Sequence, residues 1–170
     1  MKNDLSNEIS NTKAELLQVL NLFDRENINT IPFEGSWTGG QVAEHVLKSL
    51  SGALQNITGP VKYTERKPDE HVKQLADIFL NMDIKMKSPE FIIPSADPKD
   101  KTTLAASLGI ALDGIKTVAI TEDLGATCSG FEMPMLGALT RLEWISFSCY
   151  HTRRHTQQLK NIINHLKNQI

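Results

Sequence analysis

The stretch RLEWISFSCYHTRRHTQQLKNIINHL, residues 141–166, contains neither glycine nor proline and consists largely of residues that helices tolerate well. Its apolar residues recur at the three- and four-residue steps of an amphipathic helix. They include Leu142, Ile145, Leu159, Ile162 and Leu166. We therefore expect one long helix from about Gly137 to the C-terminus.

Three other proline-free stretches have the same period. The first carries Leu5, Ile9, Leu16, Leu20 and Phe23, the second Val42, Val46, Leu50, Ala53 and Ile57, and the third Leu104, Leu108, Ala111, Leu112, Ile115 and Val118. In SWTGGQVAEH, residues 36–45, Thr38 is suited to cap the second helix with Gln41 as its capping-box partner. Alternating strand patterns are nearly absent. The expected fold is all-α, an up-and-down four-helix bundle formed by residues 1–170 as a single domain.

A long connection separates the second and third helices, from Gly59 to Asp100, and it holds five of the seven prolines. A structureless loop of this length is unusual inside a compact domain. Helical spacing in DEHVKQLADIFLNM, residues 69–82, predicts a shorter fifth helix there. The following KMKSPEFIIPSADP, residues 85–98, is expected to run extended over the surface.

Composition excludes several classes of protein. A formal net charge of −2 and a pI near 6.2 give no reason to expect nucleic acid or an anionic membrane as partner. Only two cysteines occur, as expected in a reducing cytosol. MKNDLSNEIS, at the start, lacks the apolar run of a signal peptide, and no uninterrupted apolar stretch approaches the roughly 20 residues of a membrane span. A cytoplasmic location is expected.

The last predicted helix carries His151 and His155, four residues apart. At about 100° per residue both lie within the apolar stripe, and this spacing allows two imidazoles to bind one metal ion. Thr152, Arg153 and Arg154 fill the gap, so the glutamate base of the zinc-protease motif is missing.

Three further histidines are candidates for a third ligand. His165 lies ten residues beyond His155, about 15 Å along the helix, and His71 falls in the connection, where we expect it to be solvated. His45 lies at the edge of the apolar stripe of the second helix and can face the last one. Three neutral imidazoles with an open position are typical of a catalytic metal site. The alternative is a set of histidines at the core edge that bond to backbone groups.

Three neighbours of these histidines are candidates for supporting roles. Gln158, one turn beyond His155, can either orient a ligand or a bound water, or satisfy a buried hydrogen bond. Tyr150 can line the rim of the pocket. Trp37 is interpreted first as an apolar anchor at the end of the second helix and second as a site residue.

Three motifs carry a resemblance to a known family. They are W-T-x-x-Q-V-x-x-H from Trp37 to His45, PMLGALTRLEW from Pro134 to Trp144, and Y-H-x-x-x-H-x-x-Q from Tyr150 to Gln158. With the insert MKSPEFIIP, residues 86–94, the chain resembles the DinB-like superfamily, which includes the YfiT-type metal-dependent hydrolases. One departure is EMP, residues 132–134, where a histidine before the proline is expected.

The resemblance implies the bundle with its long excursion, a triad at His45, His151 and His155 that binds zinc or nickel, and a homodimer. Characterised relatives include metal-dependent transferases of low-molecular-weight thiols such as mycothiol or bacillithiol, and glutathione-dependent isomerases. A divalent metal can activate a thiol or water. We therefore expect a metal-dependent hydrolase or thiol S-transferase acting on a small molecule, with no catalytic side chain identified. The alternative is a non-catalytic bundle that binds metal or ligand, or only dimerises.

Overall fold

The computed structural model describes residues 2–168, and these contain five α-helices and a sheet of two short strands. The helices are α1 (Lys2–Asn21), α2 (Gly39–Thr58), α3 (Val72–Phe79), α4 (Lys101–Thr121) and α5 (Arg141–Lys167). The strands, β1 (Val61–Lys62) and β2 (Thr127–Cys128), pair antiparallel. The prediction of a mainly helical chain is confirmed. Residues 169–170, included in the predicted last helix, lie outside the described part.

The first residues of α2 and α5 are fixed by capping boxes. At α2 the Thr38 hydroxyl accepts from the Gln41 N–H and the Gln41 side chain accepts from the Thr38 N–H, as predicted. Thr140 and Glu143 form the same pair at α5, so this helix begins four residues later than the expected Gly137. Gly137 itself lies in a turn with a φ of 73°. A local cap therefore overrides the apolar period in setting where α5 begins.

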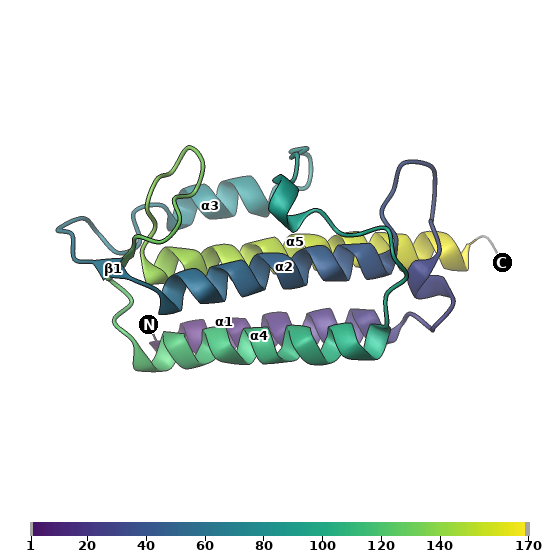
Figure 1. The fold of residues 1–170 in the computed structure, drawn as a ribbon, viewed down its shortest axis with the longest axis horizontal. Coiled ribbons are helices and arrows are strands. Elements are labelled where there is room, and N and C mark those ends of the chain that lie inside the picture. Colours follow the sequence, from purple (N-terminus) through teal and green to yellow (C-terminus); the bar gives the residue numbers. More distant parts are fainter. Residues whose placement is uncertain (1, 169–170) are drawn as a thin grey trace.

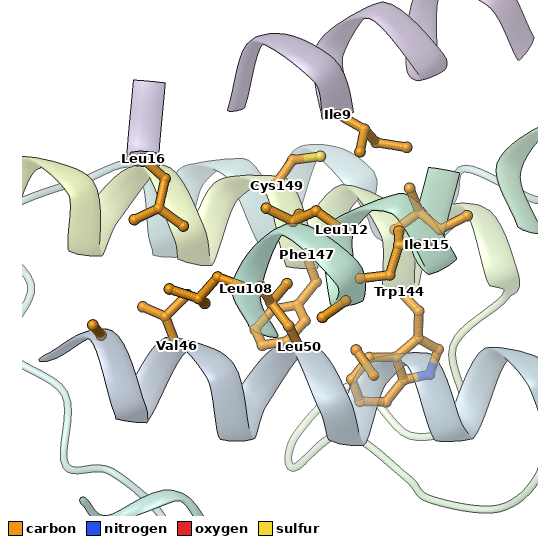
Figure 2. Close-up of a cluster of buried hydrophobic side chains, with 14 of the residues drawn as sticks. Ile9, Leu16, Val46, Leu50, Leu108, Leu112, Ile115, Trp144, Phe147 and Cys149 are labelled. Atoms are coloured by element: carbon orange, nitrogen blue, oxygen red, sulfur yellow. The ribbon is translucent and has the colours of Figure 1, made fainter. Parts of the chain in front are cut away.

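The four long helices pack side by side around one apolar core, and each of α1 and α2 contacts both α4 and α5. Figure 2 shows side chains from all four helices converging in the core, among them Ile9, Leu50, Leu112 and Phe147. The shorter α3 packs on α5, on the side away from α1 and α4 (Figure 1). Burial of these stripes supplies the main stabilising free energy.

The directions of the helices differ from the expected up-and-down order. Glu8 of α1 pairs with Arg153 of α5, and Glu15 pairs with Lys160, seven residues further along each helix. These two helices therefore run in the same direction. The helices α2 and α4 also run the same way, because residues 59–100 return along the length of the molecule before α4 begins (Figure 1). The order is up, down, down, up, which a long connection permits and a short loop does not.

The connection between α2 and α4 has more structure than expected. The predicted fifth helix is present as α3, within residues 69–82. The segment expected to be extended contains a 3₁₀ turn at Glu90–Ile92 that contacts α2. Strand β1 follows α2 directly and pairs with β2, a short sheet that the sequence did not predict.

Helix α4 is long and apolar enough, by length and composition alone, to cross a membrane, and no other described helix is. Its apolar residues Leu108, Leu112 and Ile115 are fully buried in the core. Two polar contacts also join α4 to α1. Lys13 of α1 forms an ion pair with Asp113 of α4, and the Lys116 ammonium of α4 donates a hydrogen bond to the Ser10 hydroxyl of α1. Packing among the other helices accounts for the apolar character of α4.

One buried carboxylate joins the connection to the first turn of α5. The Glu143 side chain is fully buried and accepts two hydrogen bonds from Arg66, at 2.8 and 2.6 Å, and one from the His71 N–H at 2.8 Å. Burial disfavours its ionised form, but Arg66 and the Thr140 and His71 N–H groups outweigh this, so the pKa of Glu143 is lowered. The carboxylate is charged at neutral pH and holds α3 against α5.

Replacing Glu143 tests this anchor. Glu143→Ala should lower the free energy of unfolding by about 3–5 kcal/mol, because it leaves the charge of Arg66 without its carboxylate and the N–H groups of His71 and Thr140 without an acceptor. The matched control is Asp77→Ala, which removes an exposed i, i+4 pair with Lys73 and should cost less than about 1 kcal/mol. Urea unfolding of both variants measures the difference, and equal losses would contradict the assignment.

Candidate metal centre

The packing of α2 on α5 brings three imidazoles together. The Nε2 atom of His151 lies 3.2 Å from Nε2 of His45 and 3.2 Å from Nε2 of His155. All three candidate ligand atoms lie within 4.8 Å of one another. His45 and His151 are buried, and His155 is partly buried. The cluster predicted from the sequence is therefore present as a geometric unit.

Hydrogen bonds on the far side of two rings fix which nitrogen faces the centre. Nδ1 of His45 donates to the carbonyl of Ile92 at 2.9 Å. Nδ1 of His155 donates to Oε1 of Gln158 at 2.7 Å. Because a neutral imidazole carries one proton, Nε2 of each ring is left with a lone pair that points into the cluster.

The cluster cannot satisfy all its nitrogens by itself. His151 Nε2, between the other two, can donate a proton to only one of them, and its Nδ1 atom is buried without a hydrogen-bond partner. One lone pair therefore always faces another nitrogen, and a buried unsatisfied polar group costs about 1–3 kcal/mol. A cation bound by the three Nε2 atoms would remove this conflict, so the donor set fits a divalent metal ion.

All three rings are held neutral. Burial lowers the pKa of His45, partly opposed by the bond to Ile92. Burial, followed by repulsion from the other two histidines, places the pKa of His151 well below its usual value. Burial and the nearby His45 lower the pKa of His155 to about 4. Neutral imidazoles are the form that binds metal.

The cluster opens into a large cleft. Its volume is about 2290 Å³, and its lining comes from α2, α3, α5, residues 82–93 of the connection and the loop 130–136. The ring of Trp37 lies 5.1 Å from His45, and those of Phe147 and Phe79 lie 5.3 and 5.9 Å from His151, centroid to centroid. A ligand in the cleft can therefore reach the Nε2 atoms by passing these three aromatic rings.

Comparison with known proteins assigns the family. The family model described as the DinB superfamily matches residues 8–159, which include all three histidines. The chain belongs to the DinB superfamily. No curated protein and no solved structure matches significantly. Membership and the histidine cluster together are compatible with a metal site.

The other candidate residues of this DinB chain divide into two groups. Gln158 and Trp37 lie at the site: Gln158 orients His155, and the half-buried Trp37 both packs on the core and lines the cleft. Tyr150 does not line the cleft, contrary to expectation. Its partly buried side chain lies near Glu8 and Arg153, because position 150 faces α1.

The remaining histidines and the cysteine on α5 stay outside the cluster. His71 is the residue before α3, and its N–H bonds to Glu143. His165 is exposed and lies edge-on to Phe33 at 5.4 Å. Cys149 is buried in the core, where burial raises the pKa of its thiol to about 12. His71 and His165, which the sequence placed away from the histidine pair of the last helix, therefore lie outside the cluster, as does Cys149.

Sequence reasoning missed two parts of the site in this DinB protein. One is the Ile92 carbonyl, which fixes the tautomer of His45; a backbone acceptor has no signature in a single sequence. The other is Arg154, for which the sequence suggested no role at the site. Its guanidinium instead donates to the carbonyls of Phe79, Asn81 and Ile84, which ties the end of α3 to α5 beside the cleft.

Two adjacent glutamines provide a matched test of the hydrogen bond to His155. Gln158→Ala should weaken zinc binding by about 10-fold or more, because it releases the ring that Gln158 orients. Gln157→Ala, which removes only a bond to the Asn161 side chain, should leave the affinity unchanged. Competition titration against a zinc-binding dye measures both, and similar affinities for the two variants would show that Gln158 does not support the site.

Acid should destabilise the metal-free protein through the cluster. The pKa of His155 is about 4 in the folded protein and about 6.5 in the unfolded chain. Its contribution to the free energy of unfolding is therefore complete above pH 6.5 and is lost as the pH falls towards 4. Between pH 6.5 and 5 the loss should be about 2 kcal/mol. Urea unfolding in the presence of a chelator measures it. His155→Gln should flatten this dependence, whereas His165→Gln should not; identical profiles for the two variants would contradict the prediction.

Proposed function

We propose that this DinB protein is a four-helix-bundle metalloprotein in which His45, His151 and His155 hold one zinc or nickel ion. We further propose that it activates a thiol for transfer to a small-molecule electrophile. The observation that carries the proposal is the convergence of three neutral imidazoles, two of which point the Nε2 lone pair at Nε2 of His151. Ligands bound tetrahedrally at about 2.0–2.1 Å lie about 3.3 Å apart, close to the two 3.2 Å separations here.

The site leaves room for a further ligand. With three protein nitrogens bound, a divalent metal keeps an open position, and there it would lower the pKa of a thiol from about 8.5 and supply a thiolate nucleophile. The protein supplies the remaining functions. Ile92 and Gln158 keep His45 and His155 in the required tautomer, and the rings of Trp37 and Phe147 pack against His45 and His151.

The absence of a base favours a thiol over water as nucleophile. None of the 20 aspartates and glutamates, all of which lie within residues 2–168, lines the cleft. Glu44 is adjacent to His45 in sequence, but it pairs with Lys99 and Lys48 and accepts from the Ser95 N–H. Hydrolysis by this kind of site commonly uses a carboxylate as general base, whereas a thiol of pKa near 8.5 needs none.

The size of the cleft fits a reaction between two molecules. Sites for one drug-sized ligand usually measure about 300–1,000 Å³. A cleft of about 2290 Å³ can therefore hold a low-molecular-weight thiol together with its electrophile. This capacity supports group transfer over the binding of a single small ligand.

The metal site is tested by an alanine series on protein purified without a metal-affinity column, which avoids nickel from the resin. His45→Ala, His151→Ala and His155→Ala should each lower zinc affinity by more than about 100-fold, exceeding the usual effect of a residue that only orients a ligand. His71→Ala and His165→Ala should retain full affinity. Retention of zinc by His45→Ala, or its loss in His165→Ala, would refute the triad.

Turnover tests the reaction itself. Metal-reconstituted protein should accelerate conjugation of a low-molecular-weight thiol to an aromatic electrophile such as 1-chloro-2,4-dinitrobenzene, followed by absorbance. The acceleration should be absent from His151→Ala and present in His165→Ala. Full metal binding without acceleration by any of several thiols would favour a non-catalytic metal-binding protein, and hydrolysis of ester substrates instead would favour a hydrolase.

A further inference from the structure

Aromatic rings form a continuous path along the cleft to the histidines. Phe91 contacts Phe131, with ring centroids 5.8 Å apart, and Phe131 contacts Trp144 at 6.0 Å. Trp144 contacts Phe147 at 5.5 Å, and Phe147 reaches His151 at 5.3 Å. Trp144 and His151 are seven residues apart on α5, so the part of this wall along α5 is about 10 Å long. An elongated apolar molecule can lie along it.

The charged side chains of the cleft are all cationic. Lys48, Lys85, Lys87 and Arg154 line it, and no acidic residue does. Lys48 is partly neutralised by Glu44, 3.3 Å away. The other three have no carboxylate partner among the described residues. On a chain with a net charge of −2, this local excess of positive charge favours an anionic ligand.

Two of the four cations lie beside the histidines on the same helices. Arg154 precedes His155 on α5, and Lys48 lies less than one turn beyond His45 on α2. The Lys48 ammonium donates a hydrogen bond to the carbonyl of Ile93. This residue directly follows Ile92, whose carbonyl accepts from His45. The cleft therefore has cations beside the histidines, and its aromatic wall leads away from them along α5 to an aromatic end at Trp144 and Phe131.

Two buried polar atoms lie at the aromatic end. Nε1 of Trp144 and Oδ1 of Asn56 have no hydrogen-bond partner within residues 2–168, although their residues are only 4% and 6% exposed. Both residues line the cleft and both contact the loop at Phe131. An unpaired donor and an unpaired acceptor of this kind can be satisfied by a ligand that reaches them.

We infer that the cleft binds a small anionic amphiphile, an elongated apolar molecule with a carboxylate, sulfonate or phosphate group at one end. The apolar part lies along the aromatic wall, and the anion lies among the cations that line the cleft. The inference rests on the proposed function only in making this molecule the substrate that meets the activated thiol. Binding itself requires the cleft and its cations, and not the metal.

A pair of fluorescent probes tests the charge preference. 1-Anilinonaphthalene-8-sulfonate and N-phenyl-1-naphthylamine have the same aromatic framework, and only the first is anionic. The sulfonate should bind chelated protein at least about fivefold more tightly, the effect of one unit charge about 4 Å away in a watery environment. It should also quench the tryptophans, because Trp37 and Trp144, the two in the chain, both line the cleft. Equal affinity for the two probes would overturn the inference.

Matched variants locate the charge. Lys85→Gln combined with Lys87→Gln should abolish most of the preference for the sulfonate and leave the affinity for the neutral probe unchanged. Lys62→Gln combined with Lys67→Gln removes the same charge from exposed positions outside the cleft and should have no effect. Identical behaviour of the two double variants would show that the cleft lysines do not select the ligand.

A blocking variant locates the probe. A side chain at Gly52 meets no atom within 4 Å of its Cβ, and this position on α2 lines the cleft. Gly52→Phe should therefore fold normally and weaken binding of both probes; unchanged binding would place them elsewhere and overturn the inference. Zinc titration of the unaltered protein separates the two proposals. A protein that prefers the sulfonate but does not bind zinc refutes the proposed function alone. A protein that binds zinc but does not prefer the sulfonate refutes this inference alone.

Discussion

The register between α2 and α5 is the constraint on which the site depends. At one end of this helix pair, the guanidinium of Arg141 donates to the Ile57 carbonyl at 2.8 Å. Further along, His45 meets His151 and His155. A slip of one residue along α5 would rotate its side chains by about 100° and remove both imidazoles from His45. The apolar stripes that bury Val46 and Leu50 against α5 and α4 hold the same register.

The histidine cluster is a local exception to the chemistry of the core. The surrounding side chains are apolar, and three imidazoles among them leave lone pairs in conflict and one nitrogen unpaired. Such polar groups lower stability unless something satisfies them, and features of this kind concentrate at functional sites. A bound metal ion would stabilise the native state to the extent that it binds there. The free energy that these unsatisfied groups cost is thus coupled to ligand affinity.

The connection between α2 and α4 is part of the site and more than a spacer. It supplies the Ile92 carbonyl that fixes the tautomer of His45, and it carries Lys85 and Lys87 at the cleft. Arg154 and the Glu143–Arg66 pair hold it against α5. The same connection reverses the expected helix order, because it returns the chain to the end where α2 began. Residues that lack any regular period therefore decide both the topology and the shape of the cleft.

The sequence by itself determined the helices and identified the three histidines that cluster in the structure. Apolar period and capping chemistry act within a few residues, so α2 with its Thr38 cap, α4 and α5 could be predicted, as could the exclusion of His71 and His165. The i, i+4 spacing alone placed His151 and His155 on one face. Tertiary structure decided what depends on distant partners: the parallel direction of α2 and α4, the role of Ile92 and the orientation of Tyr150 towards α1. Backbone acceptors and interhelical contacts are set by packing over the whole chain, and no local pattern encodes them.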